Sequence, residues 1–245
     1  MSVSETQPRA REGVSNRERL IVALDVPDIK AAQRLVETLD DSVEFYKIGL
    51  ELAMSDGYFE LLRWLLGRNK RVFADLKLYD IPATVSAAVR QLADCGASLL
   101  TVHGERAVVA AAAASAGGSL KILAVTVLTS MSQDDLAASG ITMDLGRLVQ
   151  HRAAMAIAAG AAGVVASGHE ARDLRALLGT EPLIVTPGIR PAFAAGRDDQ
   201  ARVVTPRLAI ESGASHLVVG RPIRAAEDPY AAACAIQDEI AAACQ

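Results

Sequence analysis

Three charged residues follow one another at short intervals in a run that is otherwise apolar. Asp75 and Lys77 lie two residues apart, and Asp80 follows three residues later. Residues two apart on a β-strand point to the same face, so an extended chain would place Asp75 and Lys77 side by side. A lysine held among carboxylates stays protonated, which suits it to stabilise developing negative charge and then to donate a proton.

Buried charges of this kind are costly unless they are paired. With Lys47, which lies in the preceding apolar run, Asp75, Lys77 and Asp80 could form an alternating network of two cations and two anions. The alternative is an ion pair that only fills the interior of the protein, and an isolated Asp-x-Lys pattern does not separate the two.

Two short segments near the C-terminus each combine a glycine with an arginine. The first reads Pro-Gly-Ile-Arg and ends at Arg190, and the second contains Gly220 and Arg221. Glycine lets an anion approach backbone N–H groups, and arginine supplies a forked, permanently charged donor. Either segment alone could be an ordinary turn with a solvated arginine, but the two together favour a phosphate site.

Eight short apolar runs alternate with longer amphipathic stretches along the chain. This alternation is typical of parallel βαβ units, and the continuously apolar runs indicate strands covered on both faces. The runs predict strands at residues 20–24, 43–48, 72–76, 98–102, 122–127, 163–166, 183–185 and 217–219. The stretches predict helices at residues 29–39, 58–66, 84–94, 107–116, 145–159, 171–178, 203–212 and 231–243.

We therefore expect an α/β protein, a single (β/α)8 TIM barrel, for which 245 residues is an ordinary length. Active sites in this fold lie at the carboxyl ends of the strands, and the loops after strands seven and eight commonly hold a phosphate. Asp25 ends the first predicted strand, so it joins Lys47, Asp75 and Lys77 at that mouth. Charge concentrated there favours a functional site over a structural ion pair.

No change in composition divides the chain. We assign residues 1–18 to a flexible N-terminal tail and residues 19–245 to the barrel, which would be the catalytic domain. The connection at residues 129–146 is polar and longer than the others, so it is either disordered or a mobile lid over the site.

Composition narrows the class of protein further. The formal net charge of −4 argues against a nucleic-acid partner, which usually requires a basic surplus. No apolar run is long enough to cross a bilayer, and the N-terminus lacks the apolar core of a signal peptide. Three cysteines without a Cys-x-x-Cys pair suit a reducing compartment, so we expect a cytoplasmic protein.

The segment at residues 75–84 reads DLKLYDIPAT and is similar to the DLKxxDIPxT signature of the orotidine 5′-monophosphate decarboxylases. Further matches follow in the order of that family and cover most of the chain outside the N-terminal tail. They lie at residues 23–25, 46–49, 125–130, 186–190, 199–206 and 218–223. The resemblance implies a carboxy-lyase that converts orotidine 5′-monophosphate to UMP and CO₂ in de novo pyrimidine biosynthesis, with no metal and no cofactor.

The resemblance also implies roles for individual residues. Lys77 would protonate C6 of the pyrimidine, and Asp75 would lie against the substrate carboxylate. Asp25 and Lys47 would hold the ribose hydroxyls, with Lys47 also in the charge network. The further substrate-binding residues would be Thr129 and Ser130 at the base and Arg190, Gln200, Gly220 and Arg221 at the phosphate.

The resemblance further implies a homodimer in which Asp80 and Thr84 reach across the interface into the partner's site. Some residues depart from the family pattern. Tyr79 stands where many members have histidine, and Ala83 where asparagine is usual. The segment that begins at His103 lacks the usual small, glycine-rich sequence, so we interpret His103 as structural.

Two other functions compete with this interpretation. The first is a Mg²⁺-dependent sugar-phosphate decarboxylase or aldolase of the same superfamily, in which an acid after the second strand binds metal; Glu51 is the residue that fits. The second is a non-catalytic phosphate-binding barrel. Such a barrel would have no need for Lys77 between two aspartates.

Overall fold

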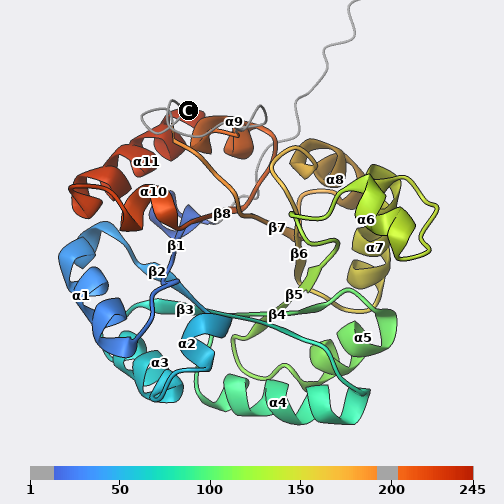
Figure 1. Ribbon diagram of the computed structural model, residues 1–245, viewed down its shortest axis with the longest axis horizontal. Helices are drawn as coiled ribbons and strands as arrows, with labels where there is room; N and C mark the ends of the chain where they lie inside the picture. The colour runs from blue at the N-terminus through green and yellow to red at the C-terminus, as the bar shows by residue number, and fades with distance from the viewer. Residues whose placement is uncertain (1–13, 192–203, 245) are drawn as a thin grey trace, which may run out of the picture.

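Eight parallel strands close into one barrel in chain order, with the helices arranged around it (Figure 1). The protein is therefore an α/β TIM barrel, as predicted. This computed structural model describes residues 14–191 and 204–244. The strands are β1 (Leu20–Ala23), β2 (Phe45–Gly49), β3 (Arg71–Leu78), β4 (Leu99–His103), β5 (Lys121–Val125), β6 (Gly163–Val165), β7 (Leu183–Thr186) and β8 (His216–Val219).

Every predicted helix has a counterpart in the structure. The long helices are α1 (Ile29–Leu39), α3 (Tyr58–Leu66), α4 (Pro82–Asp94), α5 (Arg106–Ser115), α7 (Leu145–Ala158), α8 (Ala171–Leu178) and α11 (Pro229–Ala243). The helix predicted at residues 203–212 is α9 (Pro206–Glu211). It begins late because Thr205 caps it, accepting a hydrogen bond from the Leu208 amide, and because proline suits a first helical position.

The sequence prediction missed five short helical elements. These are the helical turns η1 (Arg17–Arg19) and η2 (Asp40–Ser42) and the short helices α2 (Leu50–Ala53), α6 (Gln133–Ala138) and α10 (Arg221–Arg224). Helices of one or two turns do not show a measurable apolar period. Three of them, α2, α6 and α10, follow the carboxyl ends of strands, where the candidate site lies.

Each strand buries two apolar faces. In β1, Leu20 and Val22 pack outward against the helices, whereas Ile21 and Ala23 point into the barrel. This explains why the strands read as unbroken apolar runs. On β2 and β3 the inward positions change character along the strand, from Phe45 and Phe73 near the amino ends to charged residues near the carboxyl ends.

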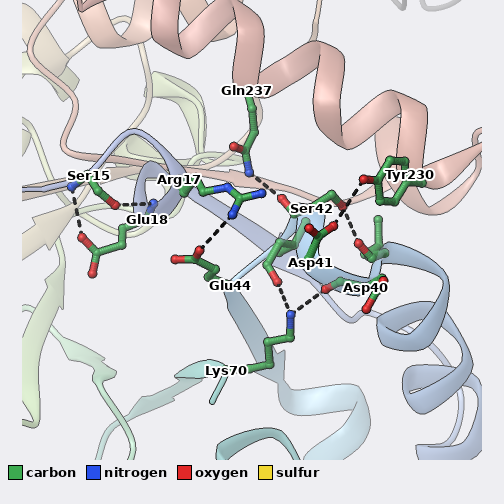
Figure 2. Close-up of polar contacts among 12 residues, drawn as sticks. Ser15, Arg17, Glu18, Asp40, Asp41, Ser42, Glu44, Lys70, Tyr230 and Gln237 are labelled. Atoms are coloured by element: carbon green, nitrogen blue, oxygen red, sulfur yellow. Dashed lines mark hydrogen bonds and ion pairs between the residues drawn. The ribbon is translucent and has the colours of Figure 1, made fainter. Parts of the chain in front are cut away.

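Polar contacts among residues that precede β2 and β3 fasten the amino-terminal face of the barrel. Figure 2 shows these contacts. The ammonium group of Lys70 donates to the carbonyl oxygens of Asp40 at 2.5 Å and of Val43 at 2.8 Å. From α11, Gln237 donates to the carbonyl oxygen of Ser42 at 2.6 Å. These bonds attach the last helix and the start of β3 to the turn before β2.

The first described residues of the chain, near its N-terminus, pack against the same amino-terminal face of the barrel. Glu18 forms an ion pair with Arg71 at 2.5 Å, and Arg17 lies 3.6 Å from Glu44. The tail predicted at residues 1–18 therefore includes Arg17 and Glu18, which contact the barrel. Residues 1–13 lie outside the described residues. No helix within residues 14–191 and 204–244 is both long enough and apolar enough to cross a membrane.

The segment at residues 129–146 contains a capped helix. Ser132 and Asp135 form a reciprocal capping box at the start of α6. The Gln133 side chain donates to the carbonyl oxygen of Met143 and accepts from the Leu145 amide, which ties the far end of the segment back to the helix. In Figure 1, α6 lies over the outer ring of helices and away from the centre of the barrel.

Candidate active site

A cavity of about 580 Å³ opens at the carboxyl ends of the strands. Inward-pointing apolar side chains of the barrel form part of its wall, among them Ala23, Phe73, Val165 and Val218. Eight charged side chains line it as well: Asp25, Lys47, Glu51, Asp75, Lys77, Arg190, Arg221 and Arg224. The prediction that charge gathers at the barrel mouth is confirmed.

Four of these side chains form an alternating chain of anions and cations. Lys47 Nζ lies 2.8 Å from Asp25 Oδ1 and 3.4 Å from Asp75 Oδ2. Lys77 Nζ lies 2.8 Å from Asp75 Oδ1. Sequence reasoning paired the two lysines with Asp75 and Asp80, but within this chain Asp25 takes the place of Asp80 in the network.

Asp75 is the centre of this network. Its burial alone would raise the pKa of the carboxyl group, but the charges of Lys47 and Lys77, together with hydrogen bonds from Lys77 and Thr101, outweigh burial and hold the pKa below its ordinary value. The side chain is 13 % exposed, so solvent screens these interactions only weakly. Asp75 therefore remains ionised between two ammonium groups.

The backbone at Lys77 is in an unusual conformation. Its φ is +47°, in the left-handed region that residues other than glycine seldom adopt. The strand register with β4 also shifts between Ala74 and Leu78. Such a conformation costs roughly 1–3 kcal/mol and tends to occur at functional sites. Lys77 and Asp75 do share a side of β3, but through a bulge and not through regular strand alternation.

Gly49 makes room for the network. A Cβ atom at this position would lie 3.0 Å from Lys47 Nζ and 3.5 Å from Asp25 Oδ1. Gly49 is the residue of β2 opposite Asp75 in the register. A larger side chain there would push the Lys47 amine away from its two carboxylates.

The part of the cavity wall that follows β7 and β8 carries the arginines. Arg190 lies two residues after Gly188, whose φ of +76° favours glycine because a Cβ atom would be strained there. The backbone N–H of Arg190 donates to the carbonyl oxygen of Val204 at 3.1 Å. Gly220 and Arg221 lie at the start of α10. Arg224, one turn later, also lines the cavity. Sequence reasoning missed it, although its spacing of three from Arg221 was visible.

The predicted base-binding and interface residues differ in their placement. Thr129 lines the cavity, whereas Ser130, Asp80 and Thr84, which are all described residues, are exposed and lie outside its wall. Asp80 accepts a hydrogen bond from the Ile81 amide at 2.6 Å. Gln200 lies outside the described residues.

His103 ends β4 beside the site. Its ring centroid lies 5.0 Å from that of Tyr79, with the planes tilted by 43°. It is half-buried and, among the described residues, is not part of the cavity wall. Thr101, two residues earlier, contacts both Asp75 and Lys77, and sequence reasoning did not single it out because one threonine in an apolar strand is common.

Metal binding was the competing possibility. Glu51 lines the cavity, as the alternative requires. Within the described ranges, no three His, Cys, Asp or Glu side chains come together in an arrangement that could hold an ion. What the described residues do offer is a fixed ammonium donor at one part of a cavity and guanidinium groups at another.

Known proteins resemble this chain over nearly its whole length. Residues 18–236 match the family model described as "Orotidine 5'-phosphate decarboxylase / HUMPS family". An orotidine 5′-phosphate decarboxylase of Afipia carboxidovorans is 54 % identical over 93 % of this chain and 96 % of its own. One of Xanthomonas euvesicatoria pv. vesicatoria is 53 % identical over 96 % and 97 %.

Solved structures show the same likeness. The crystal structure of an orotidine 5′-phosphate decarboxylase from Lactobacillus acidophilus superposes with a TM-score of 0.79 at 35 % identity. The match covers 90 % of this chain and 98 % of that one.

Proposed function

The chain belongs to the orotidine 5′-phosphate decarboxylase / HUMPS family, and on that premise we propose that it converts orotidine 5′-monophosphate to UMP and CO₂. As a member it is a carboxy-lyase of this type; the pathway, de novo pyrimidine biosynthesis, and the roles of its residues are part of the proposal. One observation carries it: Lys77 faces a cavity that also carries Arg190 and Arg221, with its amine fixed by Asp75.

The reacting carbon is C6 of the pyrimidine. When the bond from C6 to the carboxylate breaks, CO₂ leaves and the electron pair stays on C6, in an orbital that the ring delocalises poorly. The protein must stabilise this charge electrostatically. Lys77 supplies a positive charge and then transfers a proton from Nζ to C6, which yields UMP. Solvent restores the proton to the amine.

Asp75 holds Lys77 ready for this step. Because its pKa lies below the ordinary value, the carboxylate stays charged and favours the protonated form of the lysine. The carboxylate of the substrate would lie against Asp75. The ammonium group of Lys47 lies near the other oxygen of Asp75, Oδ2, and balances its negative charge. Lys47 and its partner Asp25 would together hold the ribose hydroxyls.

The phosphate would bind far from C6. Arg190, Gly220 and Arg221 would grip it, together with Gln200, while Thr129 and Ser130 border the base. Binding energy from such a non-reacting group can lower the barrier when it closes loops and aligns the base. We propose that Gln200 and the segment at residues 129–146 fold over the bound nucleotide, and the internal bonds of Gln133 support movement of that segment as a unit.

We also propose that the enzyme is a homodimer in which Asp80 and Thr84 complete the partner's site. Tyr79 and Ile81, on either side of Asp80, are 63 % and 66 % exposed, although both are large and apolar. Exposed apolar side chains beside a residue that is proposed to act in the partner's site are what a dimer interface would cover.

The test is to add purified protein to orotidine 5′-monophosphate and follow the loss of its ultraviolet absorbance, with UMP identified by chromatography. We expect turnover that persists in EDTA. Loss of activity in EDTA, restored by Mg²⁺, would favour the metal-dependent alternative at Glu51. Binding of the nucleotide without any turnover would favour the non-catalytic barrel.

A further inference from the structure

We propose that Thr101, on β4, is a positioning residue for this reaction, whose hydroxyl group fixes Lys77 and Asp75 relative to each other. The proposal rests on the proposed function, because it assigns Thr101 a part in that site. Thr101 is 0 % exposed and lies behind the cavity wall formed by the described residues, so it would act through its neighbours and not on the substrate.

Thr101 lies opposite the bulge that carries Lys77. In the register of β3 with β4, Ala74 pairs with Leu100 and Leu78 pairs with Val102. The three residues 75–77 of β3 therefore face a single residue of β4, which is Thr101. A bulge of this kind interrupts the ladder, and the backbone groups inside it need other partners.

The hydroxyl group of Thr101 supplies those contacts. Its oxygen accepts a hydrogen bond from the backbone N–H of Lys77 at 3.0 Å and donates to Asp75 Oδ1 at 2.9 Å. The directions are fixed, because a backbone N–H group can only donate and an ionised carboxylate can only accept. One side chain thus connects the backbone of the proton donor to the carboxylate that orients its amine.

Both connections bear on where the Lys77 amine lies. Asp75 Oδ1 accepts hydrogen bonds from both the Thr101 hydroxyl group and the Lys77 amine, so the carboxylate cannot rotate freely. Lys77 has a φ of +47°, and a strained conformation persists only where its surroundings determine it. Threonine is stiff about its first side-chain bond, which makes it a firm support for both groups.

A purely structural role for Thr101 predicts a different outcome. If the hydroxyl group only satisfied buried polar atoms, its removal would lower the melting temperature and leave the folded enzyme fully active. If it positions Lys77, removal would lower kcat, because a misplacement of about 1 Å can cost about 100-fold in rate. Substrate binding through the ribose and phosphate would change little.

The experiment compares Thr101→Val, Thr101→Ser and Thr186→Val with the wild type. Valine keeps the shape of threonine without the hydroxyl, and serine keeps the hydroxyl. Thr186 is a matched control, since it is equally buried at the end of β7 and its hydroxyl has no hydrogen-bond partner among the described residues. Melting temperature, kcat and KM are measured for each.

We expect Thr101→Val to lower kcat about 10- to 100-fold with KM within about 3-fold. We expect Thr101→Ser to recover most of the loss and Thr186→Val to resemble the wild type. Wild-type kcat in Thr101→Val, or an equal loss in Thr101→Ser, would overturn the inference while leaving the proposed function intact. Lack of turnover by the wild type would instead overturn the proposed function.

Hydrogen exchange of the Lys77 amide tests the contact without relying on a variant or on activity. In the wild type this amide should be protected, because it donates to Thr101. If Thr101→Val does not fold, exchange of the wild-type amide decides alone. Exchange as fast as that of an exposed loop amide would show that the bond does not hold Lys77, and the inference would fall.

Discussion

Lys77 Nζ lies 2.8 Å from Oδ1 of Asp75, a residue only two positions earlier in the same strand. The contact spans a bulge in β3, where the backbone of Lys77 adopts the left-handed conformation. The side chain of Asp75 is mostly buried and that of Lys77 is 30 % exposed, so the pair lies at the boundary between the barrel interior and the cavity. This geometry underlies the predictions that concern catalysis.

Replacement of Lys77 by alanine should abolish decarboxylation and leave nucleotide binding in place. The variant loses both the positive charge near C6 and the proposed proton donor, whereas the arginines of the cavity remain. Turnover is measured by ultraviolet absorbance and UMP binding by calorimetry. Substantial decarboxylation by Lys77→Ala would refute the role assigned to the lysine.

Replacement of Arg221 by alanine should lower kcat/KM by about 30- to 5,000-fold, which corresponds to roughly 2–5 kcal/mol for a desolvated charge pair with phosphate. Orotidine, which lacks the phosphate, is the diagnostic substrate. Its kcat/KM should be the same for Arg221→Ala and the wild type. The matched control is Arg207→Ala, which removes an exposed arginine paired with Glu211 on α9. An equal loss with both substrates would contradict phosphate binding by Arg221.

Two variants that are each inactive should regain decarboxylase activity when they form a heterodimer with one another. If Asp80 acts in the partner's site, a heterodimer of Lys77→Ala and Asp80→Ala contains one intact site. Random mixing should then recover about one quarter of wild-type activity, because about half of the dimers are heterodimers with one working site each.

The matched control for this exchange mixes Lys77→Ala with Asp75→Ala. Both changes affect residues that one protomer contributes to its own site, so neither site of that heterodimer is intact. Mixtures are refolded together and assayed for turnover. Recovery in the control, or none in the Asp80 mixture, would argue against an interface contribution from Asp80.

His216 should make the fold less stable as the pH falls below about 6.5. Burial first, and then the charges of Arg71 and Arg19, lower the pKa of this histidine in the folded protein to about 3. The unfolded chain takes up a proton near pH 6.5, but the folded protein does not until about pH 3. Its contribution is therefore present above pH 6.5 and is lost on acidification, by up to about 1.4 kcal/mol per pH unit.

The measurement is urea unfolding of the wild type and His216→Leu at several pH values from 8 to 4. Leucine cannot titrate, so the difference in free energy of unfolding between the two proteins should itself shift with pH, in favour of the variant in acid. The ring of His216 also packs edge-on against Phe45, so some constant loss is expected. A difference in free energy of unfolding between the two proteins that stays constant from pH 8 to pH 4 would contradict the lowered pKa of His216.

Lys70→Met should lower the free energy of unfolding by about 1–3 kcal/mol, because the carbonyl oxygens of Asp40 and Val43 lose their donor. Methionine retains much of the apolar stem. These contacts, which Figure 2 shows, involve residues that precede β2 and β3 and so lie at the amino-terminal face, and kcat/KM should not change. Lys30→Met, on the exposed side of α1, is the control and should be neutral. A large fall in kcat/KM would show coupling between the two faces.

The barrel and seven of the eight charged side chains of the cavity wall could be predicted from the order of residues alone. Strand and helix patterns repeat over short distances, so they can be read from neighbouring residues alone. Once the fold is a parallel barrel, every strand presents its carboxyl end to the same mouth, which places Asp25, Lys47, Asp75 and Lys77 together without knowledge of any distance. The same logic brought Arg190 and Arg221 to that mouth.

How these groups contact one another depends on the three-dimensional packing of the strands. Asp25, and not Asp80, completes the charge network within the chain, and Thr101 contacts Asp75 from 26 residues away. The bulge at Lys77 depends on the register between β3 and β4, which no local pattern encodes. A sequence specifies the face on which a residue lies, but hydrogen-bond partners follow from how separate strands pair in space.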